Sequence, residues 1–231
     1  MSTFLLHQEP DFTVLLADSL GTKSTPAIGT RIPLTAPKIV HVAPCAYAVH
    51  AGTWQPALEM LSRARDCIAT PGAVSDWAPF CATLKTIGTE VYDKYKGVFA
   101  LNEFDVRVAL VLTGALRHPD DVAALRSSTL LLWEVARSFD PVRAVGYLHF
   151  AGTKPLSDLA TTVLSQEPML HLLRQSPLSC AQALVATHAL LSRISTQIGG
   201  DMNVVVAGHD ANHTVIHGTL VDLAQAAILK G

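Results

Sequence analysis

The feature that most constrains the fold is the order in which strand-like and helix-like segments follow one another. Stretches rich in β-branched and apolar residues and bounded by Gly, Pro or Asp are typical of strands. They lie at 12–17, 38–51, 105–114, 129–135, 144–152, 203–208 and 214–220. Apolar residues at helical spacing predict helices at 54–69, 75–95, 156–164, 176–195 and 221–229. The series therefore runs strands, two helices, strands, two helices, strands, one helix.

Paired helices between groups of strands favour antiparallel sheets that are covered by helix layers, whereas single helices between strands would favour a parallel sheet. We therefore predict an α+β fold, a four-layer αββα sandwich of two antiparallel sheets with a helix pair outside each. The helix at 176–195 carries a further signal, because Ser176 followed by Pro177 is typical of an N-cap and a first turn. Loops are expected at 20–30, 69–76 and 117–128.

Length and composition indicate how large a core the chain can bury and whether it associates with other chains. The chain has 231 residues, of which 49% are hydrophobic and 16% charged. A chain of this length can bury a large core, and we expect residues 1–231 to form a single domain. So apolar a chain with so few charges also predicts an oligomer, because large exposed apolar patches are rare on monomers.

Charge and cysteine content narrow the range of partners, cysteine sites and cellular locations that we expect. The formal net charge of −2 and the pI near 6.5 offer no basic footprint, so neither nucleic acid nor an anionic membrane is expected as a partner. The four cysteines include no CxxC pair, which argues against a zinc knuckle and a dense disulfide framework. With no export signal and no apolar run of about 18 residues, a cytoplasmic location is expected.

Three stretches resemble a known family. They are VLLADSLGT at 14–22, KIVHVAPCAYAVHAGT at 38–53 and IGGDMNVVVAGHD at 198–210. In this order they are similar to the three signature regions of proteasome β-type subunits, including the HslV-type bacterial peptidase and other bacterial proteasome homologues. The resemblance spans nearly the whole chain. It implies an N-terminal nucleophile hydrolase with the αββα fold, assembled into stacked rings whose active sites face an inner chamber.

The resemblance also implies a set of catalytic residues. The family's nucleophile lies sixteen residues before an aspartate, a spacing that joins Ser2 to Asp18 here. Removal of Met1 would expose Ser2, whose own α-amino group would act as the base. The family's lysine lies fourteen residues before the glycine of the oxyanion hole, which matches Lys38 and Gly52. Asp18 would hold Lys38, and the Gly52 N–H would face the oxyanion.

Substrate and partners follow from the same resemblance. It implies that His50 forms the floor of a specificity pocket with Val40 and Trp54 as walls, so short or acidic residues are expected before the scissile bond. The expected partners are identical subunits in a single or double ring and unfolded protein or peptide substrates. Whether an ATP-driven unfoldase docks on the ring stays open. No cofactor and no metal is expected.

The sequence departs from the family at three positions that help to organise the terminal amine. Where active relatives have a serine, an aspartate and a second serine, this chain has Ile198, Ser195 and Ala151. The leading hypothesis is a self-compartmentalising threonine/serine-type peptidase subunit. The alternative is an inactive ring subunit with a structural role, and amide hydrolysis of a small molecule is a third reading, since fold does not fix function.

A rival reading concerns the histidines of HDANHTVIH. His209, His213 and His217 are spaced by four, and on a helix they would form one face that could bind zinc. The flanking segments VVVAG and TVIHG are strand-like, and GHDAN reads as a turn, so a hairpin is predicted instead. Two of the catalytic candidates also have plainer readings: Lys38 as a solvated strand end and Gly52 as a tight turn.

Overall fold

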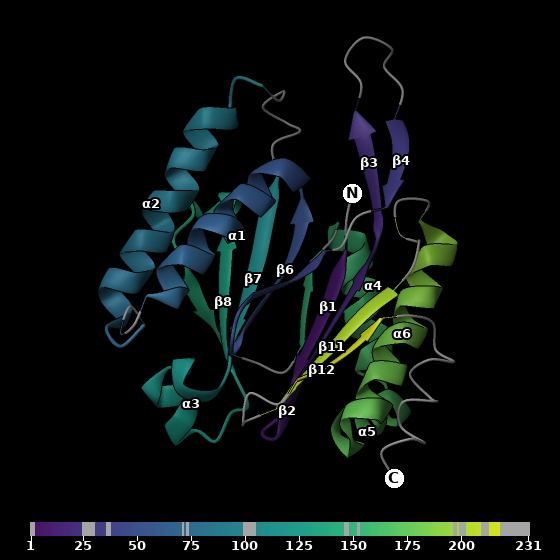
Figure 1. The fold of residues 1–231 in the computed structure, drawn as a ribbon. Helices are drawn as coiled ribbons and strands as arrows, with labels where there is room; N and C mark the ends of the chain where they lie inside the picture. The colour runs from purple at the N-terminus through teal and green to yellow at the C-terminus, as the bar shows by residue number, and fades with distance from the viewer. Residues whose placement is uncertain are drawn as a thin grey trace.

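The computed structural model describes residues 3–24, 31–35, 38–70, 72, 74–98, 105–145, 148–151, 153–195, 198, 202–208 and 213–217. Within these ranges, two five-stranded antiparallel sheets lie face to face (Figure 1). The first sheet has the order β10 (Leu148–Ala151), β1 (Phe4–Gln8), β2 (Phe12–Asp18), β11 (Met202–Gly208) and β12 (His213–His217). The second has the order β5 (Ile39–Ala43), β6 (Ala46–Gly52), β7 (Val106–Leu112), β8 (Thr129–Glu134) and β9 (Val142–Ala144). A separate hairpin joins β3 (Leu20–Ser24) to β4 (Arg31–Thr35).

Helices cover the outer face of each sheet. On the second sheet lie α1 (Trp54–Ala69) and α2 (Trp77–Tyr95). On the first lie α4 (Lys154–Leu164), α5 (Glu167–Gln175) and α6 (Pro177–Ile194). The short helix α3 (Pro119–Ala123) lies between β7 and β8 in the chain, and 3₁₀ turns occupy Gly114–Leu116 and Val135–Arg137. The predicted four-layer αββα sandwich is thus confirmed, with three helices rather than a pair on one side (Figure 1).

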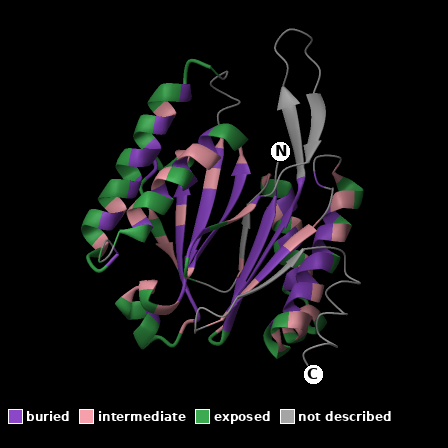
Figure 2. Ribbon diagram, in the orientation of Figure 1, coloured by how far each residue is buried: buried purple, intermediate pink, exposed green. Residues whose placement is uncertain are grey.

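Three apolar clusters correspond to the three interfaces between the four layers. Successive side chains of a strand point to opposite faces of the sheet, so alternate residues of β2 belong to different clusters. Val14 and Leu16 pack toward α4–α6, while Leu15 and Ala17 pack into the space between the sheets. Because both faces are covered, β1 and β2 are buried along their whole length, and β6 and β7 are buried at every residue but one each (Figure 2). Such strands read as continuous apolar runs, which is how they stand out in the sequence.

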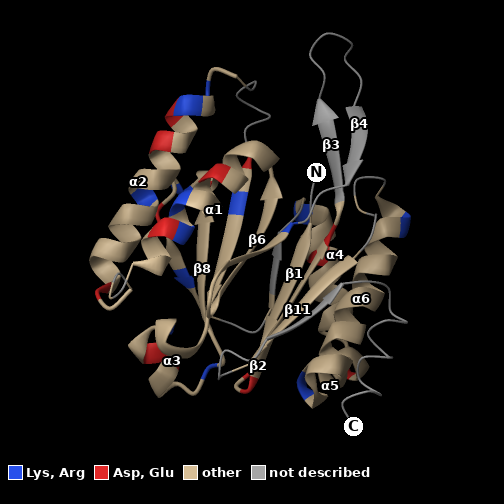
Figure 3. Cartoon of the chain, viewed as in Figure 1, with Lys and Arg blue, Asp and Glu red and all other residues tan. Residues whose placement is uncertain are grey.

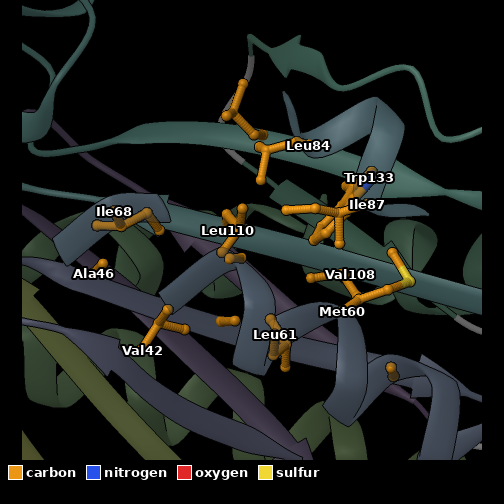
Figure 4. Close-up of a cluster of buried hydrophobic side chains, with 14 of the residues drawn as sticks. Val42, Ala46, Met60, Leu61, Ile68, Leu84, Ile87, Val108, Leu110 and Trp133 are labelled. Carbon is orange, nitrogen blue, oxygen red and sulfur yellow. The ribbon is translucent and has the colours of Figure 1, made fainter. Parts of the chain in front are cut away.

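The cluster beneath α1 and α2 is the largest of the three (Figure 4). Met60 and Leu61 of α1 meet Leu84 and Ile87 of α2 over the second sheet, where Trp133 of β8 is fully buried. The predicted stripe along α2 is confirmed, since every fourth or third residue from Phe80 to Tyr95 is buried. Charged residues gather on the helices and leave the strands nearly free of charge (Figure 3).

Local capping signals were also read correctly. The Ser176 hydroxyl accepts a hydrogen bond from the Ser179 N–H at 3.1 Å, and Pro177 occupies the first turn of α6, as predicted. The hairpin of β11 and β12 confirms that the histidine-rich stretch is not a helix. His209 lies outside the described residues, and so does the predicted helix at 221–229.

Several sequence predictions differ from the structure. The segment 38–51 is a hairpin rather than one strand, because Cys45 takes a left-handed turn with φ 64°. The predicted strand at 144–152 contains β10 of the first sheet, whereas its first residue, Ala144, is the last residue of β9 in the second sheet. The predicted loop at 20–30 begins with strand β3, and the helix at 167–175 was missed. For β9 and β10, pairing partners far along the chain decide which sheet each strand joins, and local patterns do not report this.

Candidate active site

A buried ion pair joins the two sheets. Asp18 ends β2 of the first sheet, and Lys38 immediately precedes β5 of the second. The Lys38 Nζ donates a hydrogen bond to Asp18 Oδ1, and both side chains are almost completely shielded from solvent. Burial lowers the pKa of Lys38, and the Asp18 carboxylate opposes this shift. Because an unpaired buried charge is strongly destabilising, each of the two groups depends on the other.

The start of β1 lies against the same carboxylate. The register of β1 and β2 pairs Phe4 with Ala17, so Thr3 comes opposite Asp18. The Thr3 backbone N–H donates to Asp18 Oδ1 at 3.5 Å. Ser2 lies outside the described residues, but the peptide bond joins it directly to Thr3. The structure therefore brings Asp18 and Lys38 together beside the residue that follows Ser2.

Gly52 ends β6 at a point where only glycine fits. Its φ is +92°, and a Cβ at this position would overlap the carbonyl of Asp105. Successive N–H groups of a strand point to opposite edges. The His50 N–H donates to the Lys38 carbonyl at 3.0 Å, so the Gly52 N–H, two residues later, leaves β6 on the same edge as Lys38. A backbone donor on this side is what an oxyanion hole requires.

The three pocket candidates lie on the helix-facing side of the second sheet. His50 shares its face of β6 with Ala46 and Ala48, which pack beneath α1, and Val40 packs against the same cluster. His50 is buried, whereas Trp54, the first residue of α1, is 39% exposed. The structure thus places Val40 and His50 on one face of the second sheet, with Trp54 at the more exposed start of α1.

The three positions that depart from the family surround the first sheet. Ala151 ends β10 and pairs with Phe4 of β1. Ser195 follows the last residue of α6, and the Ile198 N–H donates to its carbonyl at 3.3 Å. Ile198 is buried in the apolar cluster beneath α4–α6. An apolar side chain therefore occupies the position at which the resemblance described above led us to expect a serine.

His188 is a site residue that sequence analysis did not single out. It lies on α6, is 3% exposed, and its Nε2 has no hydrogen-bond partner among the described residues. Burial lowers its pKa; the nearby charge of Asp18 raises it, and that of Lys38 lowers it further. The signal in the sequence was an imidazole on an apolar helical stripe, between Leu184 and Leu191.

Two negative findings concern the described part of the chain. Within it, no group of three or more His, Cys, Asp or Glu side chains is arranged to hold a metal ion. None of its helices has both the length and the apolar character needed to cross a membrane.

The antiparallel sheets stacked face to face between helix layers define the fold class as that of the N-terminal nucleophile hydrolases, in its proteasome-like form. Among solved structures, the chain is similar to Anbu, the ancestral beta-subunit, from Yersinia bercovieri. The TM-score is 0.68 at 13% sequence identity, over 99% of this chain and 93% of that chain. At this identity the likeness shows the fold. No protein-family model and no curated protein matches the chain.

Proposed function

We propose that the chain is a proteasome-like ring subunit that hydrolyses peptide bonds in unfolded polypeptides, with Ser2 as the nucleophile. The observation that carries this proposal is the buried Lys38–Asp18 pair next to Thr3. A buried ion pair is weak support for stability, since packed apolar residues stabilise as well or better. The energetic cost of burying the Lys38–Asp18 pair is explained if the Lys38 ammonium takes part in chemistry at Ser2, the residue before Thr3.

In the proposed mechanism, the Ser2 hydroxyl attacks the carbonyl carbon of the scissile peptide and passes its proton to the Ser2 α-amine. The positive charge of Lys38 stabilises the alkoxide as it forms. The Gly52 N–H donates to the oxygen that becomes negative in the tetrahedral intermediate, an interaction typically worth about 3–4 kcal/mol.

The second half of the reaction regenerates the enzyme. The α-ammonium returns the proton to the nitrogen of the leaving chain, the C–N bond breaks, and an ester remains on Ser2. A water molecule then attacks this ester with the same amine as base, which releases the new carboxylate and restores the hydroxyl. Asp18 keeps its charge throughout and holds Lys38 in place.

Peptide hydrolysis by protein with a verified Ser2 terminus tests the proposal. Ser2→Ala should abolish turnover, and Lys38→Arg should lower kcat by at least about 10²-fold, because a planar guanidinium does not replace a compact ammonium. The matched control is Lys85→Arg in the exposed pair with Asp140, which should keep full activity. If wild type is active and Ser2→Ala equals it, the assigned nucleophile is wrong.

The pocket residues lead to a specificity proposal. A buried His50 on the same sheet face as Val40, with the bulky Trp54 at the start of α1, favours short or acidic side chains before the scissile bond, since an imidazole N–H can donate to a carboxylate. Cleavage of a peptide library should show this preference, and His50→Ala should extend it to larger apolar residues. A wild-type preference for bulky aromatics would contradict the assignment.

Assembly into a ring is proposed from exposed apolar side chains. Leu125 is 71% exposed after α3, and Leu190 and Ile194 are exposed on α6. A subunit interface would cover them. Light scattering should give a homo-oligomer in one or two rings, and Leu125→Glu or Ile194→Glu should weaken it. A stable wild-type monomer at micromolar concentration would exclude a ring.

An inactive structural subunit is the second candidate, and Ile198 favours it, because this buried side chain supplies no hydroxyl to the terminal amine. Mass spectrometry of protein from its native source separates the two. A chain that begins at Ser2 supports the peptidase, whereas a retained Met1 blocks both nucleophile and base and supports the structural role.

A further inference from the structure

His188 occupies an unusual place on α6. Its neighbours at helical spacing, Leu184 and Leu191, are fully buried and pack onto the first sheet. The face of α6 that is turned toward the sheet is buried (Figure 2). An imidazole within this apolar stripe loses its hydration, and its Nε2 gains no hydrogen bond from any described residue. Buried polar groups left in this state call for an explanation beyond packing.

Two other buried polar residues, Thr3 and Asp18, lie at one end of β1 and β2. Asp18 continues the alternation of Val14 and Leu16, the β2 residues that pack beneath α6. Thr3 lies opposite Asp18, and its Oγ1 is also buried without a hydrogen-bond partner among the described residues. His188 therefore lies on the buried face of α6, which packs over the face of β2 that carries Asp18, and the chain after α6 enters β11 with Met202 opposite Asp18.

Among the described residues, the charges that shift the pKa of His188 are those of Asp18 and Lys38. Asp18 comes from β2 and Lys38 from the residue before β5. The charged or titratable side chains of α4 and α5 are exposed, and so is Arg193 on α6 itself. His7 on β1 instead contacts Glu9, toward the opposite end of the strand. The charged or titratable residues of α4 and α5 are Lys154, Asp158, Glu167, His171 and Arg174.

We propose that His188 is a positioning residue for the Lys38–Asp18 pair: the neutral imidazole leaves Asp18 to Lys38, and the protonated imidazolium competes with Lys38 for Asp18. The competition is electrostatic, because two cations then share one buried carboxylate. As a consequence, acidification weakens the interaction between Lys38 and Asp18 and lowers the proposed activity. The effect on catalysis rests on the proposed function, whereas the coupling between the three side chains does not.

The protonation behaviour follows from burial. The pKa of His188 is lowered from its ordinary value of 6.5, so the imidazole is neutral at pH 7. When the pH falls below the pKa of His188, the imidazole gains a proton and a positive charge. Asp18 is by then already hydrogen-bonded to Lys38. The active form of the pair is thus present at neutral pH and lost as the pH falls through the pKa of His188.

NMR titration of the complete protein, with ¹³C-labelled histidine and lysine side chains, tests the coupling directly. Signals are assigned with His188→Gln and Lys38→Arg. In wild type, the Lys38 signal should change at the same midpoint as His188, and this step should be absent in His188→Gln, which stays neutral. The exposed Lys154 serves as control, and its signal should be the same in both proteins.

Two outcomes overturn the inference: a Lys38 signal in wild type that does not respond when His188 titrates, or the same step in His188→Gln. If His188→Gln does not fold, the wild-type titration still decides, and His188→Asn replaces it as the neutral variant. In the peptidase assay, the acidic decline of wild type, expressed relative to each protein's own activity at neutral pH, should be absent in His188→Gln. Coupling without any peptidase activity would contradict the proposed function alone.

Discussion

Gly52 lies directly against the carbonyl of Asp105, at the junction of β6 and α1. The Thr53 N–H donates to that carbonyl, and the Asp105 N–H donates to Thr53 Oγ1 at 3.2 Å. A side chain at position 52 would collide with this backbone rather than with a movable side chain. The turn that aims the Gly52 N–H therefore requires both a positive φ and the absence of a Cβ.

Gly52→Ala should destabilise the protein more than Gly72→Ala does. Both glycines have positive φ, +92° and +78°, so each substitution incurs a left-handed strain of about 1–2 kcal/mol. At Gly72 the nearest atom to a Cβ is Ser75 Oγ at 3.8 Å, whereas at Gly52 the backbone must move. Urea unfolding of both variants measures the difference, and equal losses would argue against the close approach.

The Lys38–Asp18 pair should show strong coupling. Lys38→Met and Asp18→Leu should each cost roughly 3–5 kcal/mol, because each leaves a buried charge without its partner. The double variant should recover most of that loss, since it buries no charge. Lys85→Met, in an exposed pair, is the control and should cost under about 1 kcal/mol. Additive losses in the double variant would refute the coupling.

Gly88→Ala should loosen the contact between α2 and Phe139. A Cβ on Gly88 would lie 2.5 Å from the Phe139 side chain, so helix and ring must separate. Overpacking of this kind typically costs about 1–3 kcal/mol. Gly97→Ala is the control, because no atom lies within 4 Å of its Cβ position. Thermal unfolding should show a lower Tm for Gly88→Ala only, and the double variant Gly88→Ala/Phe139→Ala should show the conflict relieved.

Cys180 should resist thiol reagents in the native protein. Burial raises the pKa of its thiol, and the charge of Glu9 adds to this effect, so thiolate is scarce at neutral pH. The side chain is also fully shielded on α6. Cys67 and Cys81 are only partly buried and should react first. Labelling followed by mass spectrometry measures the order, and early modification of Cys180 would contradict the packing of α6.

Much of the fold was readable from local patterns. The α2 stripe, the Ser176 cap and the apolar runs of β2, β7 and β11 are each dictated by residues close in sequence, because the periods of helix and strand are local properties. The separation of β9 from β10 is not readable from local patterns. These two short strands are neighbours in the sequence but pair with different partners, β8 and β1, and so belong to different sheets.

The candidate site divides in the same way. Residue spacing and resemblance were sufficient to nominate Asp18, Lys38 and Gly52, since they lie at the ends of recognisable strands. His188 carried only the faint signal of an imidazole in an apolar stripe. The position of His188 relative to the Lys38–Asp18 pair depends on how α6 packs against β2. The close approach of Gly52 to the Asp105 carbonyl depends on the pairing of β6 with β7.

The sequence by itself therefore determined the kinds of elements, their order and the residues suited to chemistry, because periodicity, capping and spacing act over a few residues. Only the tertiary structure decided which of those residues meet. Lys38 reaches Asp18 across the two sheets, and burial lowers the pKa of Lys38 and that of His188. The energy of a buried charge is set by neighbours from distant parts of the chain, and only folding brings them together.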